Sequence, residues 1–414
     1  MLIEIILALL LGCTIGTFTG LIPGIHINLV CVFLVAFSVS VFSSVNPIHL
    51  VVFITAMAIA HTFIDFIPSV FLGCPDTDTE LSVLPGHELL KQGNGYQAVI
   101  LTCYGSLAAI FTLIVTAFPF MLLAEKIYSV LKTPYIMTTT LIITSIFLVS
   151  LEKKKFSALF VFLISGFLGL CVLNLKSINQ PLLPMLTGLF GSSMLLQSIK
   201  NKIKIPKQKI INPRTEIQKP IASAFLGSLI ASPLCSFLPG LGSGQAAVIG
   251  NIISRTNKKG FLVLLGATNT LVMGFSFISL YVVSKTRTGS AIAIQEIVGK
   301  LSWQILILIL AVILISGIIS FFITMFLAKF FSQKIAKINY TTISTITLIF
   351  LAIIIFMVSG FLPSNENSII SGFLGLIILI ASTFTGIYCI NLRVRRTQMM
   401  GCLLIPTIFF YLFL

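Results

Sequence analysis

The sequence predicts an all-α polytopic membrane protein with two inverted-topology repeats, each a broken re-entrant helical hairpin followed by about five transmembrane helices. Composition is the first reason: 57% of the 414 residues are hydrophobic and 9% are charged, whereas a water-soluble domain has roughly 25% charged residues. The second is a series of apolar runs, each long enough to cross a hydrocarbon core about 30 Å thick. The third is a pair of Pro-Gly breaks, each in the middle of a long apolar stretch.

The first predicted hairpin occupies residues 2–45 and carries Leu21-Ile-Pro-Gly-Ile-His-Ile-Asn28 at its centre. Its apolar start has no basic segment before it and no A-x-A cleavage site after it, so we expect a structural segment and not a signal peptide. Because Pro and Gly interrupt a continuous helix, the chain is expected to turn there. Five crossings are then expected near residues 48–72, 96–124, 134–151, 156–175 and 181–199.

The second predicted hairpin lies between basic blocks at 200–219 and 255–259 and carries Phe237-Leu-Pro-Gly-Leu-Gly-Ser-Gly244 at its centre. Short basic blocks between apolar runs are typical of cytoplasmic loops, and this explains the net charge of +15 better than nucleic-acid binding does. With both blocks inside, the stretch between them enters and leaves on one side; two full crossings would satisfy the same charges. Five crossings are expected afterwards near residues 260–284, 302–328, 340–362, 368–391 and 398–414.

The two halves are predicted to have opposite orientations. When the basic block at 153–155 is placed inside as well, the first hairpin has to enter from the outside, and both termini lie outside. The chain is therefore divided into a first repeat at 1–199, a basic cytoplasmic linker at 200–219 and a second repeat at 220–414.

Two short alignments support this duplication. Leu21-Ile-Pro-Gly-Ile25 aligns with Phe237-Leu-Pro-Gly-Leu241, and Ala60-His-Thr-Phe63 aligns loosely with Thr268-Asn-Thr-Leu271. Inverted repeats with helices broken at equivalent places are typical of secondary transporters, whose binding sites lie at the breaks.

The candidate substrate-binding residues belong to the two breaks and to the polar centre of a later crossing. A helix that restarts after a break presents free N–H groups and its positive dipole end, which suit an anion, and glycines let a ligand approach the backbone. The alternative is that the breaks are kinks between packed helices. The candidates are Pro23, Gly24, His26, Asn28, Pro239, Gly240, Gly242, Ser243, Gly244, Gln245 and Asn269.

His61 and Asp65 are candidates for ion coupling. They lie four residues apart within an apolar run and therefore share a helical face. Because ionisable groups are costly inside a membrane, Asp65 is expected to carry a proton or to bind a cation such as Na⁺. The alternative is that Asp65 caps a helix after a break, given Pro68 nearby.

Polar loops supply candidate gates. Asp76 and Asp78 lie in the acidic stretch 73–80, and Lys285 and Arg287 lie in its basic counterpart in the second half. An acidic inner gate and a basic outer gate would favour anions entering from outside, although a solvated loop is the simpler interpretation. The acidic stretch lacks the Gly and the distal Glu of a calcium loop. The eight cysteines are scattered without C-x-x-C spacing, so we predict neither a metal site nor disulfides.

Three stretches resemble the TctA family, the large membrane subunit of tripartite tricarboxylate transporters, and look most like its archaeal branch. They are Phe237-Leu-Pro-Gly-Leu-Gly-Ser-Gly-Gln-Ala-Ala247, Leu84-Pro-Gly-His-Glu-Leu-Leu-Lys-Gln-Gly93 and Arg395-Arg-Thr-Gln-Met-Met-Gly401. The resemblance implies an ion-driven permease for carboxylates such as citrate, served by an extracytoplasmic binding protein and a small membrane subunit. The chain departs from the family at Pro23-Gly-Ile-His26, at Pro75-Asp-Thr-Asp78 and at Leu265-Gly-Ala-Thr-Asn-Thr270, which lacks an acidic residue usual in the family.

The predicted function is thus transport of a small organic anion across the cytoplasmic membrane, coupled to Na⁺ or H⁺ and with no other cofactor. Translocation of a phosphate-bearing lipid carrier is the alternative, because paired broken hairpins also admit a head group. An intramembrane enzyme is disfavoured because the chain has no H-E-x-x-H, no G-x-S-x-G and no nucleophile clustered with a base. Expected partners are the anion and membrane lipids, but not nucleic acid.

Overall fold

The computed structural model describes most of the chain, and all structural statements below concern these parts of it. They are residues 2–22, 27, 30, 31, 34, 45–73, 79, 81, 83–178, 180–201, 205–210, 218–238, 241–286, 288–335, 340–361 and 368–413.

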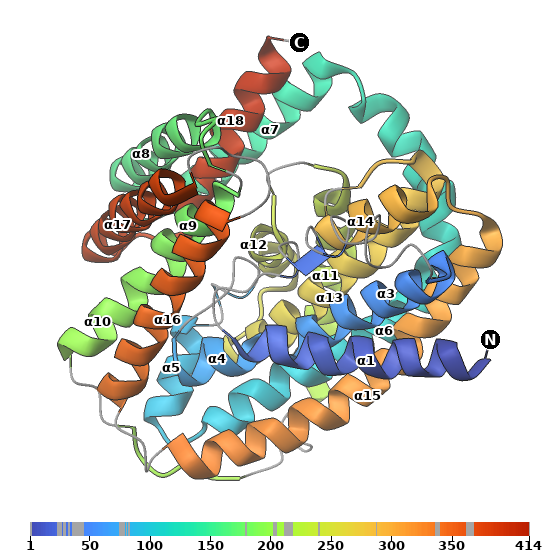
Figure 1. The fold of residues 1–414 in the computed structure, drawn as a ribbon, viewed down its shortest axis with the longest axis horizontal. Coiled ribbons are helices and arrows are strands. Elements are labelled where there is room, and N and C mark those ends of the chain that lie inside the picture. The colour runs from blue at the N-terminus through green and yellow to red at the C-terminus, as the bar shows by residue number, and fades with distance from the viewer. Residues whose placement is uncertain are drawn as a thin grey trace.

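The described residues form helices and connecting loops, with no strand among them (Figure 1). The helices of the first half are α1 (Leu2–Leu21), α3 (Pro47–Ile64), α4 (Phe66–Phe71), α5 (Val83–Lys91), α6 (Gly95–Leu131), α7 (Pro134–Ser150), α8 (Lys155–Leu173), α9 (Leu182–Leu186), the π-helix η2 (Thr187–Ser192) and α10 (Ser193–Asn201). Those of the second half are α11 (Gln218–Phe237), α12 (Ser243–Ser254), α13 (Lys258–Val283), α14 (Gly289–Val298), α15 (Trp303–Ile335), α16 (Tyr340–Phe361), α17 (Ser368–Leu392), the 3₁₀-helix η3 (Arg396–Met400) and α18 (Gly401–Leu412).

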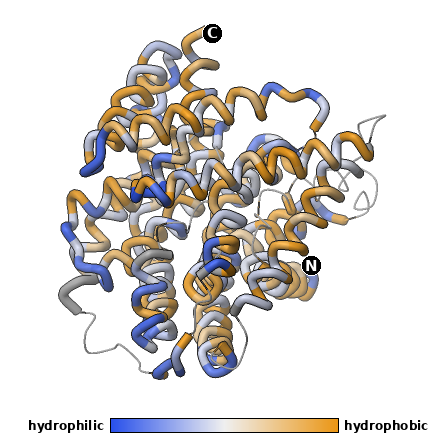
Figure 2. Tube along the Cα trace, turned by 90° about the vertical axis from the view of Figure 1, so that its left-hand side faces the viewer, coloured by the Kyte–Doolittle hydropathy of each residue, from blue (hydrophilic) through white to orange (hydrophobic). Residues whose placement is uncertain are grey.

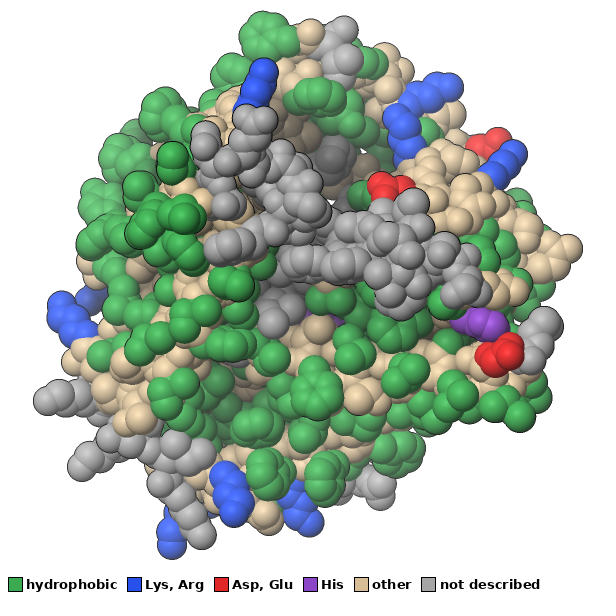
Figure 3. Space-filling view, in the orientation of Figure 1, with side chains coloured by type: hydrophobic (Ala, Val, Ile, Leu, Met, Phe, Trp, Pro, Cys, Tyr) green, Lys and Arg blue, Asp and Glu red, His purple; other side chains and the backbone are tan. Residues whose placement is uncertain are grey.

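Eight helices of the described chain are long and apolar enough to cross a membrane. They are Leu2–Leu21, Pro47–Phe71, Gly95–Leu131, Lys155–Leu173, Lys258–Val283, Trp303–Ile335, Thr341–Gly360 and Ile369–Leu392. Figure 2 shows hydrophobic residues along most of the tube, and in Figure 3 hydrophobic side chains cover much of the visible face, with Lys and Arg toward its edges. Phe156 is 91% exposed and Phe167 70%. Water does not favour such a surface but lipid does, and the prediction of a polytopic helical membrane protein is confirmed.

The order of helices repeats between the halves. Each half starts with a 20-residue helix, α1 or α11. A buried helix (α3 or α13), a short helix of 9 or 10 residues (α5 or α14) and a helix of more than 30 residues (α6 or α15) come later in each half in the same order. α6 packs on α13, and α15 packs on α3. The inverted repeat, with opposite orientation of the halves in a membrane, stays a prediction.

The short helices α5 and α14 are not among the predicted elements. At 9 and 10 residues they are too short to show a clear hydrophobic period, and Pro85-Gly86 in α5 indicates a loop from sequence alone. Tertiary packing stabilises both helices instead, since α5 packs on α4 and α6 and α14 packs on α3. Each short helix therefore belongs to the packed body of the protein.

The second Pro-Gly break joins two helices that pack against each other. A Cβ on Gly227 of α11 would lie 2.3 Å from the carbonyl oxygen of Gly250 of α12, so the two backbones are in contact. With 12 residues, α12 is about 18 Å long, which is shorter than a hydrocarbon core of about 30 Å. This geometry favours the helical hairpin over two full crossings.

Backbone contact between small residues also holds the centre of the fold. A Cβ on Gly105 of α6 would lie 2.1 Å from the carbonyl oxygen of Val263 of α13, and one on Gly266 would lie 2.0 Å from that of Thr102. The Ser106 hydroxyl donates to the Gly266 carbonyl at 3.0 Å. Small residues allow such close helix packing in membranes, where van der Waals contact replaces the hydrophobic effect as the driving force.

Part of the basic linker docks on the turn between α5 and α6. Gln208 donates to the Leu90 carbonyl at 3.0 Å and accepts from the Gly95 N–H at 2.7 Å. The Lys209 N–H donates to the Gly93 carbonyl at 2.7 Å. These bonds satisfy backbone groups at the end of α5 and at the start of α6. Hydrogen bonds therefore attach residues 205–210 to the first half.

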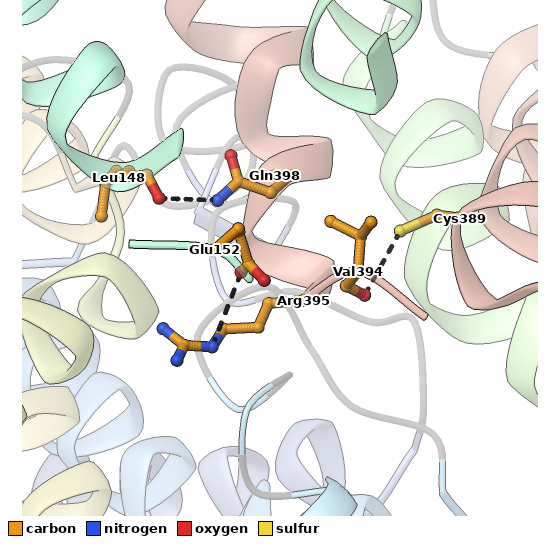
Figure 4. Close-up of polar contacts among 6 residues, drawn as sticks. All are labelled: Leu148, Glu152, Cys389, Val394, Arg395 and Gln398. Atoms are coloured by element: carbon orange, nitrogen blue, oxygen red, sulfur yellow. Dashed lines mark hydrogen bonds and ion pairs between the residues drawn. The ribbon is translucent and has the colours of Figure 1, made fainter. Parts of the chain in front are cut away.

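Polar contacts fasten η3 to the turn between α7 and α8 (Figure 4). Arg395 pairs with Glu152 at 3.5 Å, and Gln398 donates to the Leu148 carbonyl at 3.0 Å. Arg396 donates to carbonyl oxygens of η2, at 3.1 Å for Leu189, and lies over the Phe190 ring. Since η3 opens the last helix of the second half and α7, α8 and η2 belong to the first, these contacts join the halves.

Candidate functional site

The start of α12, directly after the second predicted break, lies inside the protein. Gly242 directly precedes α12 in an extended conformation, and its N–H donates to the Gln245 side-chain oxygen at 2.7 Å. Ser243 is 1% exposed and Gln245 is 0% exposed. The Gln245 Nε2 group is buried and finds no hydrogen-bond acceptor among the described residues. Because a buried donor without an acceptor is costly, this amide is suited to a ligand oxygen at the start of α12.

Asn269, in the middle of α13, connects the start of α12 to the first half of the chain. Its Nδ2 donates to Asp65 Oδ2 at 2.8 Å and lies 3.4 Å from the Thr62 carbonyl oxygen. Its Oδ1 accepts from the Ser243 hydroxyl at 3.4 Å. Asn269 and Asp65 are each 4% exposed. One side-chain amide therefore lies between the start of α12 and a buried acidic group.

Asp65 occupies a break between α3 and α4, and its sequence explains the break. Pro68 has no N–H to donate to the Ile64 carbonyl, and its ring crowds that carbonyl, so the helix is interrupted one turn before the proline. The Asp65 side chain makes no N-cap hydrogen bond to α4. The alternative in which Asp65 merely caps a helix is therefore not supported, because its carboxylate faces Asn269 instead.

His61 is also buried, at 4% exposure, but its ring bonds to another helix. Its Nδ1 lies 3.1 Å from the Thr19 hydroxyl of α1. One turn of α3 separates it from Asp65, and the Asp65 N–H donates to the His61 carbonyl at 3.0 Å. The two ion-coupling candidates thus lie on one helix and bond to different neighbours.

Thr62 and Thr270 meet where the two halves touch. Their hydroxyl oxygens are 3.3 Å apart, and they are the residues that the loose alignment of the halves pairs with each other. Sequence analysis did not select either threonine, or Thr19, as a site residue. Threonine is common in apolar helices, so only its neighbours in space distinguish it.

Most of the remaining predicted site residues lie in parts of the chain that the structure does not describe. Lys285 is exposed on the loop between α13 and α14. Pro23, Gly24, His26, Asn28, Asp76, Asp78, Pro239, Gly240 and Arg287 lie outside the described residues. Within the described ranges, no three His, Cys, Asp or Glu side chains are grouped as a metal site would need.

Comparison with known proteins identifies the family of this chain. The tripartite tricarboxylate transporter TctA family matches residues 6–401. The chain belongs to the TctA family. The TctA-type chain is also 30% identical over 410 residues to "Uncharacterized protein MJ1079" of Methanocaldococcus jannaschii, covering 98% of this chain and 99% of that protein. No solved structure matches it significantly.

TctA membership and the eight apolar helices together make this chain a multi-pass membrane protein of a transporter family. The family is that of tripartite transporters, which have several components. The MJ1079 relative carries no assigned activity, and its similarity therefore supports the fold and the family alone.

Proposed function

We propose that this chain is a permease of the cytoplasmic membrane that carries a di- or tricarboxylate, driven by an ion gradient, and binds it at the start of α12. One observation carries the proposal: at the buried start of α12, beside Ser243 and Asn269, the Gln245 Nε2 group has no hydrogen-bond acceptor among the described residues. This amide nitrogen and the first N–H groups of α12 are neutral donors at the position where an anion would lie.

The chemistry of this position suits a carboxylate. The first turn of a helix has N–H groups without intrahelical acceptors and the positive end of the helix dipole. Gly242 and Gly244 have no side chains to keep an anion from these N–H groups. The Gln245 Nε2 adds a directed donor. Such preorganised donors bind an anion without introducing a buried positive charge.

The surroundings of the site suit transport. Ser243 belongs to a hairpin, Asn269 to a long central helix of the second half, and Asp65 to a broken helix of the first half. A site where broken helices from two repeats meet is accessible from either side when the repeats move relative to each other. Both termini are proposed to lie outside, with Lys285 and Arg287 near the outer entrance and Asp76 and Asp78 near the inner one.

The partners follow from the family. Because tripartite transporters have further components, an extracytoplasmic binding protein is proposed to deliver the anion and a small membrane subunit to accompany this chain. Both remain expectations for this chain.

Thermal unfolding of the purified protein tests the proposal. A ligand that binds only the folded state raises the unfolding temperature, so citrate or succinate should raise it in the unsubstituted protein. Gln245→Ala should reduce this increase strongly. Gln398→Ala is the matched control, because Gln398 is equally buried but bonds to Leu148 away from the site. Equal increases in both variants would contradict the site, and stabilisation by polyprenyl phosphate alone would favour the lipid-carrier alternative.

A further inference from the structure

The Asn269 amide is placed to respond to the charge of Asp65. Its nitrogen faces Asp65 Oδ2 and the Thr62 carbonyl, while its oxygen faces the Ser243 hydroxyl. An amide has donors on one side and an acceptor on the other. Its orientation is therefore set by which neighbour can accept and which can donate.

We propose that Asp65 carries the coupling proton and that rotation of the Asn269 amide transmits its protonation to the anion site at Ser243. The inference rests on the proposed function, since it names the ion and the relay for that site. With Asp65 ionised, its carboxylate accepts from Asn269 Nδ2, and the Ser243 hydroxyl donates to Asn269 Oδ1.

Protonation reverses both hydrogen bonds. A proton from the aqueous phase forms an O–H bond at Asp65 Oδ2, and this O–H group then donates toward Asn269. The Asn269 amide rotates by half a turn about its Cβ–Cγ bond, so that Oδ1 accepts from Asp65 and Nδ2 donates to Ser243 Oγ. The Ser243 hydroxyl group then no longer donates to Asn269 and can donate to an anion at the start of α12.

Charge acts in the same direction as these hydrogen bonds. The Asn269 side chain links Ser243 to Asp65, so an anion beside Ser243 would lie two hydrogen bonds from that carboxyl group. Two negative charges so close in a buried site repel strongly, so the anion binds better when Asp65 is neutral. The proton and the anion therefore favour each other's binding, as symport requires.

Other titratable groups face this region less directly. His61 lies one turn away on α3 and bonds to Thr19. On the helices packed against α3 and α4, most described acidic and basic groups lie toward helix ends, and α6 adds tyrosines and a cysteine. These groups, with Cys13 of α1, are Glu4, His87, Glu88, Lys91, Tyr96, Cys103, Tyr104, Glu125, Lys126, Tyr128, Lys258, Lys259, Tyr281, Glu296, Lys329 and Lys334.

Calorimetry of citrate binding in buffers of different ionisation enthalpy tests the inference, because it counts the protons taken up. The unsubstituted protein should take up about one proton per citrate, and its dissociation constant should rise about tenfold per pH unit in the alkaline range. Asp65→Asn should bind citrate without proton uptake, and His61→Gln should keep it. Undiminished proton uptake by Asp65→Asn, or Na⁺-dependent binding without proton uptake, would overturn the inference.

A second measurement does not depend on citrate. Infrared difference spectra on acidification should show the carbonyl band of a protonated carboxyl group that Asp65→Asn lacks and that shifts in Asn269→Ala. If the unsubstituted protein bound no carboxylate, the proposed function would fail. The infrared band would still test whether Asp65 takes up a proton and whether Asn269 responds to it. A band that is unchanged in both variants would overturn the inference by itself.

Discussion

Asn269 of the second half donates its side-chain amide to Asp65 of the first half at 2.8 Å. Asn269→Asp replaces this donor by a second carboxyl group, and two carboxylates within hydrogen-bond distance do not both ionise readily. The unfolding temperature of this variant should therefore fall, relative to the unsubstituted protein, as the pH is raised from about 5 to 8.

Asn269→Ala is the control for this effect. Loss of a buried hydrogen bond to a charged group should cost about 1–3 kcal/mol, without the additional alkaline destabilisation. If Asn269→Asp and Asn269→Ala showed the same pH dependence, Asp65 and Asn269 would not form the pair described here.

Gly105 provides a test of the central helix packing. A Cβ there would lie 2.1 Å from the Val263 carbonyl oxygen, so Gly105→Val should separate α6 from α13 and destabilise the protein by about 3 kcal/mol or more. At Gly191 the nearest atom to such a Cβ is 3.8 Å away. Gly191→Ala should therefore be tolerated. The unfolding temperatures of the Gly105→Val and Gly191→Ala variants, measured in detergent, test this difference. Equal tolerance of both would contradict the α6–α13 contact.

Arg396 should not tolerate replacement by lysine. Its guanidinium donates to the carbonyls of Leu189 and Phe190 and to the Ser193 hydroxyl, an arrangement of donors that an ammonium group cannot reproduce. Arg396→Lys should cost about 1–3 kcal/mol and increase amide hydrogen exchange in η2. The exposed Arg393 is the control, and Arg393→Lys should be close to neutral; a neutral Arg396→Lys would indicate that these bonds contribute little.

His87 of α5 predicts a pH dependence of stability. Its ring nitrogens are buried without hydrogen-bond partners among the described residues, and burial, with the nearby Lys91 charge, lowers its pKa to about 4. Between about pH 4 and 6.5 the unfolded state binds this proton and the folded state does not, so the contribution of His87 to stability is complete above pH 6.5 and is lost as the pH falls toward 4.

Replacement of His87 should remove that part of the acid sensitivity. His87→Gln should unfold at a temperature that changes less between pH 6.5 and 4.5 than that of the unsubstituted protein. His49→Gln is the matched control, since His49 pairs with Glu4. An unchanged pH profile in His87→Gln would show that this ring is hydrated.

The spans could be predicted from sequence because the bilayer imposes a length and an apolar composition on each crossing. The short helices α5 and α14 could not, because packing of α5 on α4 and α6 and of α14 on α3 stabilises them. Composition singled out Asp65 and Asn269, as polar groups in apolar runs are rare. Their hydrogen bond depends on the packing of α3 on α13, which no local pattern encodes. Arg396 belongs to one of the three stretches that resemble the TctA family, but the carbonyl groups of the π-helix η2 that accept its hydrogen bonds could not be predicted.

The binding of a carboxylate at the start of α12 is tested most directly by protection of a single cysteine. In a background with the eight native cysteines replaced, Ser243→Cys should react with a small water-soluble thiol reagent, and citrate at ten times its dissociation constant should slow that reaction about tenfold. Ser284→Cys, exposed at the end of α13, should react at the same rate with and without citrate. Citrate that stabilises the protein yet leaves the Ser243→Cys reaction unchanged would contradict a carboxylate site at α12.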